Sequence, residues 1–160
     1  MTPRPGDGWV DCRCGHRHWG LHGAAGLLLA RRGPHPAVVL QHRAEWTHQG
    51  GTWGIPGGAR EPQESATEGA LREAAEEAGI DPSLLRIVGE HVLDHGDWSY
   101  TTVLAVLTVP DAEVRPTDAE SAEIRWVPLE EVDRRPLHSG FAEAWPLLRP
   151  RIEAAIEAES

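Results

Sequence analysis

The stretch from Gly58 to Ile80, which reads GAREPQESATEGALREAAEEAGI, constrains the fold of this chain more than any other. Its alanine-rich centre favours a helix because alanine has the highest intrinsic helix propensity. Ser65 is a good residue to precede the first helical turn, and Gly79 is a good residue to end the last one. The sequence therefore predicts one helix between these two residues.

Glu76 and Glu77 stand three and four positions after Glu73 in this helix, so the three glutamates share roughly one face. Like charges at this spacing repel by about 0.2–0.5 kcal/mol per pair, and Arg72 is the basic residue beside them. A solvated acidic face is one interpretation of such a charge run. A Mg²⁺ site is the other, because this cation takes carboxylate oxygens and completes its shell with water and substrate phosphates.

The residues around the helix follow a fixed and mixed pattern. Glu64 stands six positions after Gly58 and eight positions before Arg72, and Gly79 and the aliphatic Ile80 follow the last glutamate. This spacing resembles the signature of the Nudix hydrolases. Ala74 is smaller than the aliphatic residue that the family usually carries there, which bears on packing more than on chemistry.

The resemblance implies an α+β fold, a Nudix-type α/β/α sandwich with a central mixed β-sheet. It also implies Mg²⁺-dependent hydrolysis, with Mn²⁺ as a substitute, of the diphosphate linkage in a nucleoside diphosphate-X or nucleoside triphosphate substrate by a metal-activated water. The implied partner is a small-molecule nucleotide, and homodimers are frequent in the family. The alternative is a Nudix-fold module that senses or binds a nucleotide without cutting it; such chains usually lose signature carboxylates, which this chain retains.

Site residues are carried over from the family position by position. The implied metal ligands are Gly57 through its carbonyl, Glu64, Glu73, Glu76, Glu77 and Glu120. The implied catalytic residues are Arg72, which holds a glutamate through an ion pair, and Glu76, Glu77 and Glu120. Glu120 lies in an acidic loop six residues before Trp126 and is the candidate general base, with Glu123 as the second choice.

The candidate substrate-binding residues are Arg43, Trp53, Trp98 and Tyr100. Arg43 follows a predicted strand, where related chains often hold a basic residue, although a surface arginine is an equal explanation. Trp98 and Tyr100 alternate along a later strand and could stack a nucleobase. Packing is the alternative for all three aromatic residues. Trp46 and His48 are further candidates for the pocket that selects the substrate.

The remaining elements are expected from apolar alternation and turn residues. Strands are predicted at 24–30 and 37–42, on both sides of a turn at 94–97 within residues 84–109, and at 124–127, followed by a short helix at 129–132. A last helix at 139–158 contains Pro146 and Pro150, which should kink or split it. Residues 1–22 are expected to be a loosely ordered or strand-like lead, and 23–160 a single domain.

Cys12, Cys14, His16 and His18 alternate within the lead and offer four zinc ligand types. Structural zinc pairs usually stand two to four residues apart, and four ligands within seven residues would require a strained loop. Packing against the domain is therefore the preferred interpretation of this segment, and zinc the less favoured one. Two cysteines separated by one residue also close a disulfide with difficulty, which fits a reducing compartment.

Composition excludes several classes of function. The net charge is −10, which argues against nucleic acid as a partner because a basic face supplies most of that affinity. All 15 basic residues are arginine, so a lysine Schiff base and a P-loop lysine are excluded. No apolar run reaches the length of a membrane span and no signal segment is apparent, so a cytoplasmic protein without membrane contact is expected.

Overall fold

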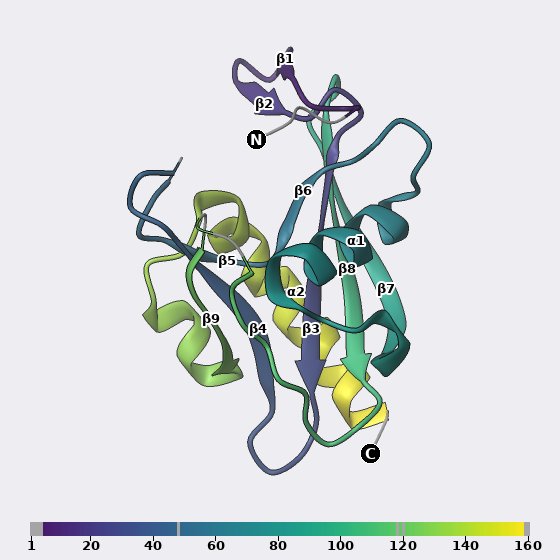
Figure 1. Ribbon diagram of the computed structural model, residues 1–160, viewed down its shortest axis with the longest axis vertical. Helices are drawn as coiled ribbons and strands as arrows, with labels where there is room; N and C mark the ends of the chain where they lie inside the picture. The colour runs from purple at the N-terminus through teal and green to yellow at the C-terminus, as the bar shows by residue number, and fades with distance from the viewer. Residues whose placement is uncertain (1–4, 48, 118, 120, 159–160) are drawn as a thin grey trace.

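The computed structural model of the protein describes residues 5–47, 49–117, 119 and 121–158. The described chain forms a β-sheet with helices on both of its faces, and a small separate hairpin near the N-terminus (Figure 1). In chain order the elements are β1 (Trp9–Asp11), β2 (Arg17–Trp19), β3 (Ala24–Arg31), β4 (Ala37–Arg43), β5 (Trp53–Gly54), β6 (Gly57–Ala59), α1 (Ala66–Ala78), η1 (Pro82–Leu84), β7 (Leu85–Asp94), β8 (Ser99–Leu107), β9 (Ser121–Pro128), η2 (Leu129–Arg134) and α2 (Ser139–Ala158).

The central sheet is mixed. Its strand order is β5-β4-β3-β8-β7, with β6 paired to β3 and β9 paired to β4. β3 runs parallel to β8, whereas β4 is antiparallel to β3 and to β9. The predicted strands within residues 24–43 and 84–109 are confirmed, including the turn between β7 and β8. An α+β sandwich with a central mixed sheet, as the resemblance implies, is therefore the fold of this chain.

The two faces of the sheet carry separate cores. Leu27 and Leu29 of β3 pack with Ala74 of α1 in one cluster, and Leu28 packs with Trp145 of α2 in the other. Consecutive strand residues point to opposite faces, so the apolar run of β3 is buried on both sides. Helix α1 lies in front of the sheet and α2 lies behind it (Figure 1). The sheet thus holds α1 by its buried alanine face.

Helix α1 begins and ends where the sequence predicts. The Glu68 backbone N–H donates to the Ser65 hydroxyl at 3.1 Å, and the Ser65 N–H donates to the Glu68 carboxylate at 3.0 Å, which forms a capping box. Gly79 ends the helix with φ 68°, a left-handed conformation that glycine adopts without a steric penalty. The length and the register of the acidic face are therefore determined locally.

Replacing Ser65 by alanine is expected to lower the free energy of unfolding by about 1 kcal/mol, since one capping acceptor is lost. Thermal and urea unfolding would measure the change. Ser65→Asp is the matched variant, because its carboxylate can still accept from the Glu68 N–H and should retain stability near that of the parent. An equal loss in both variants would contradict the capping role.

Helix α2 is continuous, so of the two expectations for its prolines, a kink or a split, the split is wrong. Pro146 and Pro150 lie inside the helix and remove two backbone donors. The cost is offset by the apolar face of the helix, which four residues bury against the sheet. They are Phe141, Trp145, Leu148 and Ile152.

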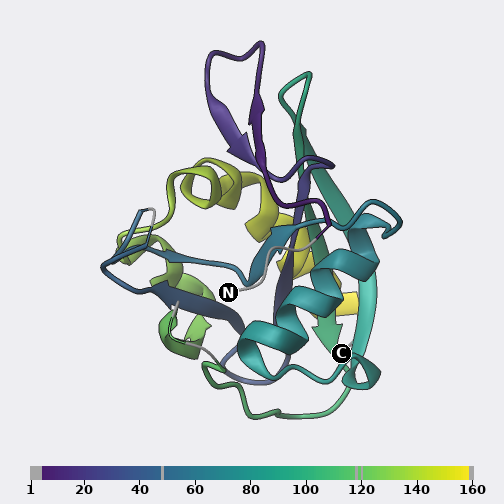
Figure 2. The same ribbon diagram turned by 45° about the horizontal axis from the view of Figure 1, so that its top comes forward.

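Residues 9–19 form a small antiparallel hairpin, so of the two expectations for this segment the strand-like one describes it. Trp9 pairs with Trp19 across β1 and β2. The hairpin lies beside the tip of the β7–β8 hairpin (Figure 2), where the Trp98 indole N–H donates to the Trp19 carbonyl at 3.2 Å. Among the described residues, no helix has the length and apolar character needed to cross a membrane.

Candidate active site

Arg72 lies at the centre of the acidic face of α1. Its Nε and Nη2 donate to the two carboxylate oxygens of Glu64 at 2.8 and 2.7 Å, a bidentate pair. Its Nη1 donates to Glu73 at 2.8 Å and reaches Glu76 at 3.4 Å. The hydrogen bonds to Glu64 are the main reason that the pKa of Arg72 is raised and that of Glu64 is lowered. One guanidinium thus orders three of the predicted carboxylates.

Glu73 is the most buried of the signature glutamates, with an exposed fraction of 9%. Burial raises the pKa of its carboxyl group, and the hydrogen bond from Arg72 opposes that rise without cancelling it. A buried carboxylate beside Glu76 and Glu77 carries an unfavourable charge, which a divalent cation would stabilise. Glu64, Glu73 and Glu76 pair with one guanidinium, and Glu77 adds a fourth carboxylate that is bound by the Gly57 N–H. The cluster therefore keeps an excess of negative charge that fits Mg²⁺ or a similar hard cation.

The β6 strand approaches the acidic face through two glycines. The Gly57 N–H donates to the Glu77 carboxylate at 3.1 Å, which joins the loop to the helix. A Cβ atom placed on Gly58 would lie 2.8 Å from Cδ of Glu73, closer than carbon atoms approach without a shift. The backbone at Gly58 can therefore lie against the Glu73 carboxylate only because this position lacks a side chain. Gly57, Glu64, Glu73, Glu76 and Glu77 are thus brought together, as the resemblance implies.

Gly58→Ala is expected to lower kcat about tenfold, since the added methyl group would displace the Glu73 carboxylate from its position beside Arg72. Steady-state kinetics at saturating Mg²⁺ would measure the loss. Gly140→Ala in α2 is the control, because the nearest atom to its new Cβ lies 3.6 Å away on His138. Full activity of Gly58→Ala would contradict the requirement for close approach.

Tyr100 and Arg43 belong to the same neighbourhood as the carboxylates. Burial and then the nearby charge of Glu77 raise the pKa of Tyr100, while the charge of Arg43 opposes the rise. A Cβ atom on Gly26 would meet the Tyr100 hydroxyl oxygen, so this hydroxyl reaches under the β3–β6 pair. Arg43 ends β4 at an irregularity in its pairing with β9. Two of the four candidate substrate-binding residues therefore lie beside the acidic face.

Trp53 and Trp98 are placed elsewhere. Trp53 is 5% exposed and packs in the core cluster on the α2 side, where it stacks on His42 with the ring centroids 4.5 Å apart. Trp98 stacks on His18 of the terminal hairpin with the centroids 4.2 Å apart, and its ring lies 6.2 Å from that of Tyr100. Trp46 is 69% exposed. The structure does not gather these indoles around the carboxylates.

Two predicted residues, Glu120 and His48, lie outside the described part of the chain. The second choice for the general base, Glu123, stands on β9 opposite His42 and forms an ion pair with Arg125. The role of Glu120 as a base or metal ligand therefore stays a prediction.

A second arginine, Arg60, lies beside the site and was not predicted from the sequence. Its guanidinium donates to the Glu64 carbonyl at 2.9 Å, and its charge helps to lower the pKa of the Glu64 carboxyl. Gln41 and Ser121 were not predicted either; both are buried, and their side-chain oxygens have no hydrogen-bond partner within the described residues. Gln41 precedes Arg43 by two positions on β4, and Ser121 pairs with Arg43. A basic residue inside the signature loop and a lone glutamine in an apolar strand were the available signals.

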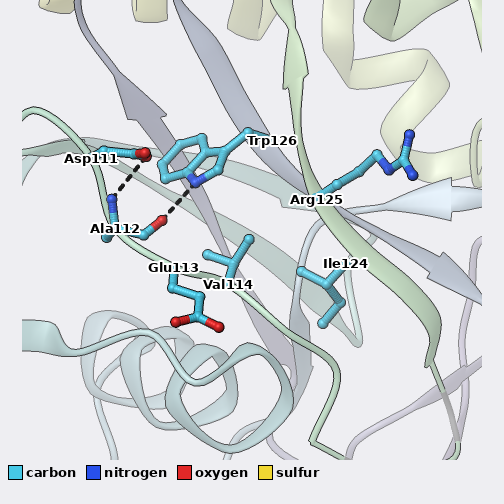
Figure 3. A pocket seen from close by; sticks show the side chains of 7 residues that line it. All are labelled: Asp111, Ala112, Glu113, Val114, Ile124, Arg125 and Trp126. Carbon is cyan, nitrogen blue, oxygen red and sulfur yellow. Dashed lines mark hydrogen bonds between the residues drawn. The ribbon is translucent and has the colours of Figure 1, made fainter.

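An open cavity of about 460 Å³ lies between β9 and residues 111–114. Figure 3 shows Trp126 at its wall, where the indole N–H donates to the Ala112 carbonyl at 2.9 Å. Its lining contains none of the site residues predicted from the sequence. The same loop continues to Thr117, whose N–H donates to the Glu77 carbonyl at 3.2 Å. The cavity is therefore a neighbour of the acidic helix, connected to its last turn by this loop.

The chain is similar to a known family and to several known proteins. The sequence profile of the NUDIX domain matches residues 20–148. A nucleoside triphosphate pyrophosphatase/Nudix hydrolase fusion protein of Bifidobacterium longum is 50% identical over 162 residues, which cover 98% of this chain and 33% of that protein. The chain therefore spans about a third of the length of that relative.

Two further relatives match over more of their own length. A protein of Mycobacterium tuberculosis provisionally named 8-oxo-dGTP diphosphatase 3 is 48% identical over 157 residues, 90% of this chain and 69% of that protein. The crystal structure of RenU, a Nudix hydrolase from M. smegmatis, superposes with a TM-score of 0.85 at 45% identity and covers 94% of this chain and 97% of that one. The match of fold, signature and sequence shows that this chain belongs to the Nudix hydrolase family.

Proposed function

We propose that this chain is a Nudix pyrophosphohydrolase that cleaves the diphosphate linkage of a nucleotide with Mg²⁺, for which Mn²⁺ can substitute. The observation that carries the proposal is the group of four carboxylates that Arg72 and the Gly57 N–H hold together at one face of α1. Such a group of like charges destabilises the fold in the absence of a cation. A bound divalent cation would neutralise the charges and remove that destabilisation.

Glu73, Glu76 and Glu77 would hold the metal, with Glu64 in support and the Gly57 carbonyl as a backbone ligand. When bound, the metal supplies charge neutralisation of the phosphate oxygens and acidifies a water. The chain's own groups orient the components. Arg72 keeps the carboxylates in position through its three ion pairs, and Arg43 offers a guanidinium for a phosphate oxygen. Glu120 remains the proposed general base, with Glu123 as the second choice.

We favour a nucleoside triphosphate over a nucleoside diphosphate sugar as the substrate. A relative that is 48% identical is named as a diphosphatase of 8-oxo-dGTP, which supports this choice. Gln41 and Ser121 flank Arg43 and hold buried oxygens without a described partner, so they suit recognition of a base or sugar hydroxyl. Trp98 and Trp53 are weaker candidates, because each is already stacked on a histidine.

The proposal is tested by incubating the protein with 8-oxo-dGTP, dGTP and ADP-ribose, with and without Mg²⁺, and by separating the products. Metal-dependent formation of a nucleoside monophosphate and pyrophosphate is the expected result with the triphosphates. Hydrolysis in ¹⁸O-labelled water, followed by mass spectrometry, would identify the phosphorus that is attacked. Nucleotide binding by calorimetry without any turnover would support the alternative, a Nudix-fold sensing module.

Three further predictions remain open to direct measurement. A cytoplasmic location fits the free thiols Cys12 and Cys14, which a reducing compartment preserves. A homodimer would be detected by light scattering at several concentrations. The absence of nucleic-acid binding, expected from the net charge of −10, would be checked by a gel-shift assay at low salt.

A further inference from the structure

The terminal hairpin gathers three side chains that commonly bind transition metals. The Sγ atoms of Cys12 and Cys14 and one ring nitrogen of His18 all lie within 4.8 Å of one another. The Cys14 Sγ and His18 Nε2 are 3.1 Å apart. In a tetrahedral zinc site with Zn–S of about 2.3 Å and Zn–N of about 2.0–2.1 Å, ligand atoms are about 3.5–3.8 Å apart. Small side-chain rotations would therefore bring the three atoms to that spacing.

The local backbone explains how closely spaced residues converge. The Gly15 N–H donates to the Cys12 carbonyl at 3.0 Å, and the Cys12 N–H donates to the His16 carbonyl at 3.0 Å, so the chain turns between β1 and β2. Gly15 has φ 93°, which accommodates the turn. The Cys14 N–H also donates to the Cys12 Sγ at 3.4 Å. The strain expected from the sequence spacing is thus avoided by a glycine turn.

A second element holds the cluster in place. The His18 ring stacks on Trp98 of the β7–β8 turn with an interplanar angle of 8°. Arg13, which lies between the two cysteines, donates through its backbone N–H to Asp97 at 2.8 Å and forms an ion pair with it at 3.0 Å. The hairpin and the β7–β8 turn are therefore joined on both sides of the cluster, which preorganises it.

We propose that Cys12, Cys14 and His18 form a zinc site in the terminal hairpin, separate from the carboxylate site and held beside the β7–β8 turn. Two thiolates and one imidazole bind zinc in preference to the hard cation Mg²⁺. The fourth tetrahedral position is left to a water or to His95, whose ring lies 4.7 Å from that of His18.

Cobalt(II) titration of the full, reduced protein in the presence of excess Mg²⁺ tests the proposal. A thiolate-to-cobalt charge-transfer band that saturates at about one cobalt per chain is expected, because carboxylate ligands do not produce this band. Zinc should displace the cobalt and abolish the band. Elemental analysis should find about one zinc per chain in the parent protein. It should find almost none in each of the variants Cys12→Ser, Cys14→Ser and His18→Ala.

Two control variants separate this site from its surroundings. Glu77→Gln should keep the charge-transfer band, since it alters only the carboxylate site. His22→Ala, at an exposed histidine near the hairpin, should also keep it. Circular dichroism would establish that each variant is folded.

Alkylation of the unmodified protein tests the zinc site without any substitution. Zinc should slow alkylation of both thiols by iodoacetamide at least tenfold. Absence of the charge-transfer band in reduced protein, or alkylation at the same rate with and without zinc, would overturn the proposal.

Discussion

Glutamine in place of Glu77 is expected to lower kcat by roughly three orders of magnitude, which corresponds to about 4 kcal/mol of transition-state stabilisation. Glu77 lies near the end of the acidic face and accepts a hydrogen bond from the Gly57 N–H at 3.1 Å. An amide oxygen can still accept that bond, so the loop and the helix should stay joined. The negative charge that would bind Mg²⁺ is lost, because an amide is a much weaker ligand for a hard cation.

Steady-state kinetics over a range of Mg²⁺ concentrations, together with thermal unfolding, would measure this effect. The melting temperature of the variant without metal should equal or exceed that of the parent, since one repelling charge is removed. Glu130→Gln is the matched control, because Glu130 is an exposed glutamate on η2. If Glu77→Gln turns over substrate as fast as this control, the assignment of the carboxylate site is wrong.

Alanine in place of Arg72 is expected to inactivate the protein and to lower its free energy of unfolding by about 2–3 kcal/mol. Glu64 and Glu73 are each 11% exposed at the side chain and would lose the guanidinium to which they are hydrogen-bonded. This loss of stability is smaller than the loss of about 3–5 kcal/mol that follows when a fully buried ion pair is broken, because Arg72 itself is 21% exposed. For a domain of this size the melting temperature should fall by roughly 4–12 °C.

Urea unfolding of Arg72→Ala, Glu64→Gln and the double variant would isolate the interaction between these two residues. The two single losses should sum to more than the loss in the double variant. Arg149→Ala is the control, since its pair with Glu153 is exposed on α2 and should contribute less than about 0.5 kcal/mol. Strictly additive losses in the cycle would show that the bidentate pair carries no stability.

The effect of Arg72 on stability should depend on pH. Arg72 holds the pKa of Glu64 below its ordinary value, so their interaction stabilises the fold above the unfolded pKa of about 4.3. This contribution is lost as pH falls through the lowered pKa of the folded state. Parent and Arg72→Ala stabilities should therefore begin to converge as the pH falls below about 4.3. A difference that stays constant down to pH 3 would contradict this explanation.

Short-range features of the sequence predicted the centre of the site. Ser65, Gly79 and the alanines between them determine where α1 begins, where it ends and which face it buries. The order of glutamates along a helix of known register then places Glu73, Glu76 and Glu77 on one face, because helical geometry repeats every 3.6 residues. Arg72 and Gly57 followed from the resemblance, and the structure places both against these carboxylates.

Contacts between distant segments were harder to predict. The alternation of Trp98 and Tyr100 predicted that both would lie on one face, but strand pairing decides what each side chain meets. Tyr100 pairs with Ala24 of β3, where burial and then the nearby charge of Glu77 raise its pKa, whereas Trp98 precedes β8 and stacks on His18 of the terminal hairpin. The split expected at Pro146 and Pro150 does not occur, because the apolar face of α2 is buried against the sheet. The prolines by themselves give no indication of that burial.

The sequence by itself thus determined the longer strands, the acidic face of α1 and the family, because each depends on residues close to one another along the chain. Tertiary structure alone decided the surroundings of that face. The pairing of β3 with β8 brought Tyr100 near that face, and the pairing of β4 with β9 placed Gln41 and Ser121 around Arg43. Such pairings depend on the packing of two apolar sheet faces between α1 and α2, which local propensity does not encode.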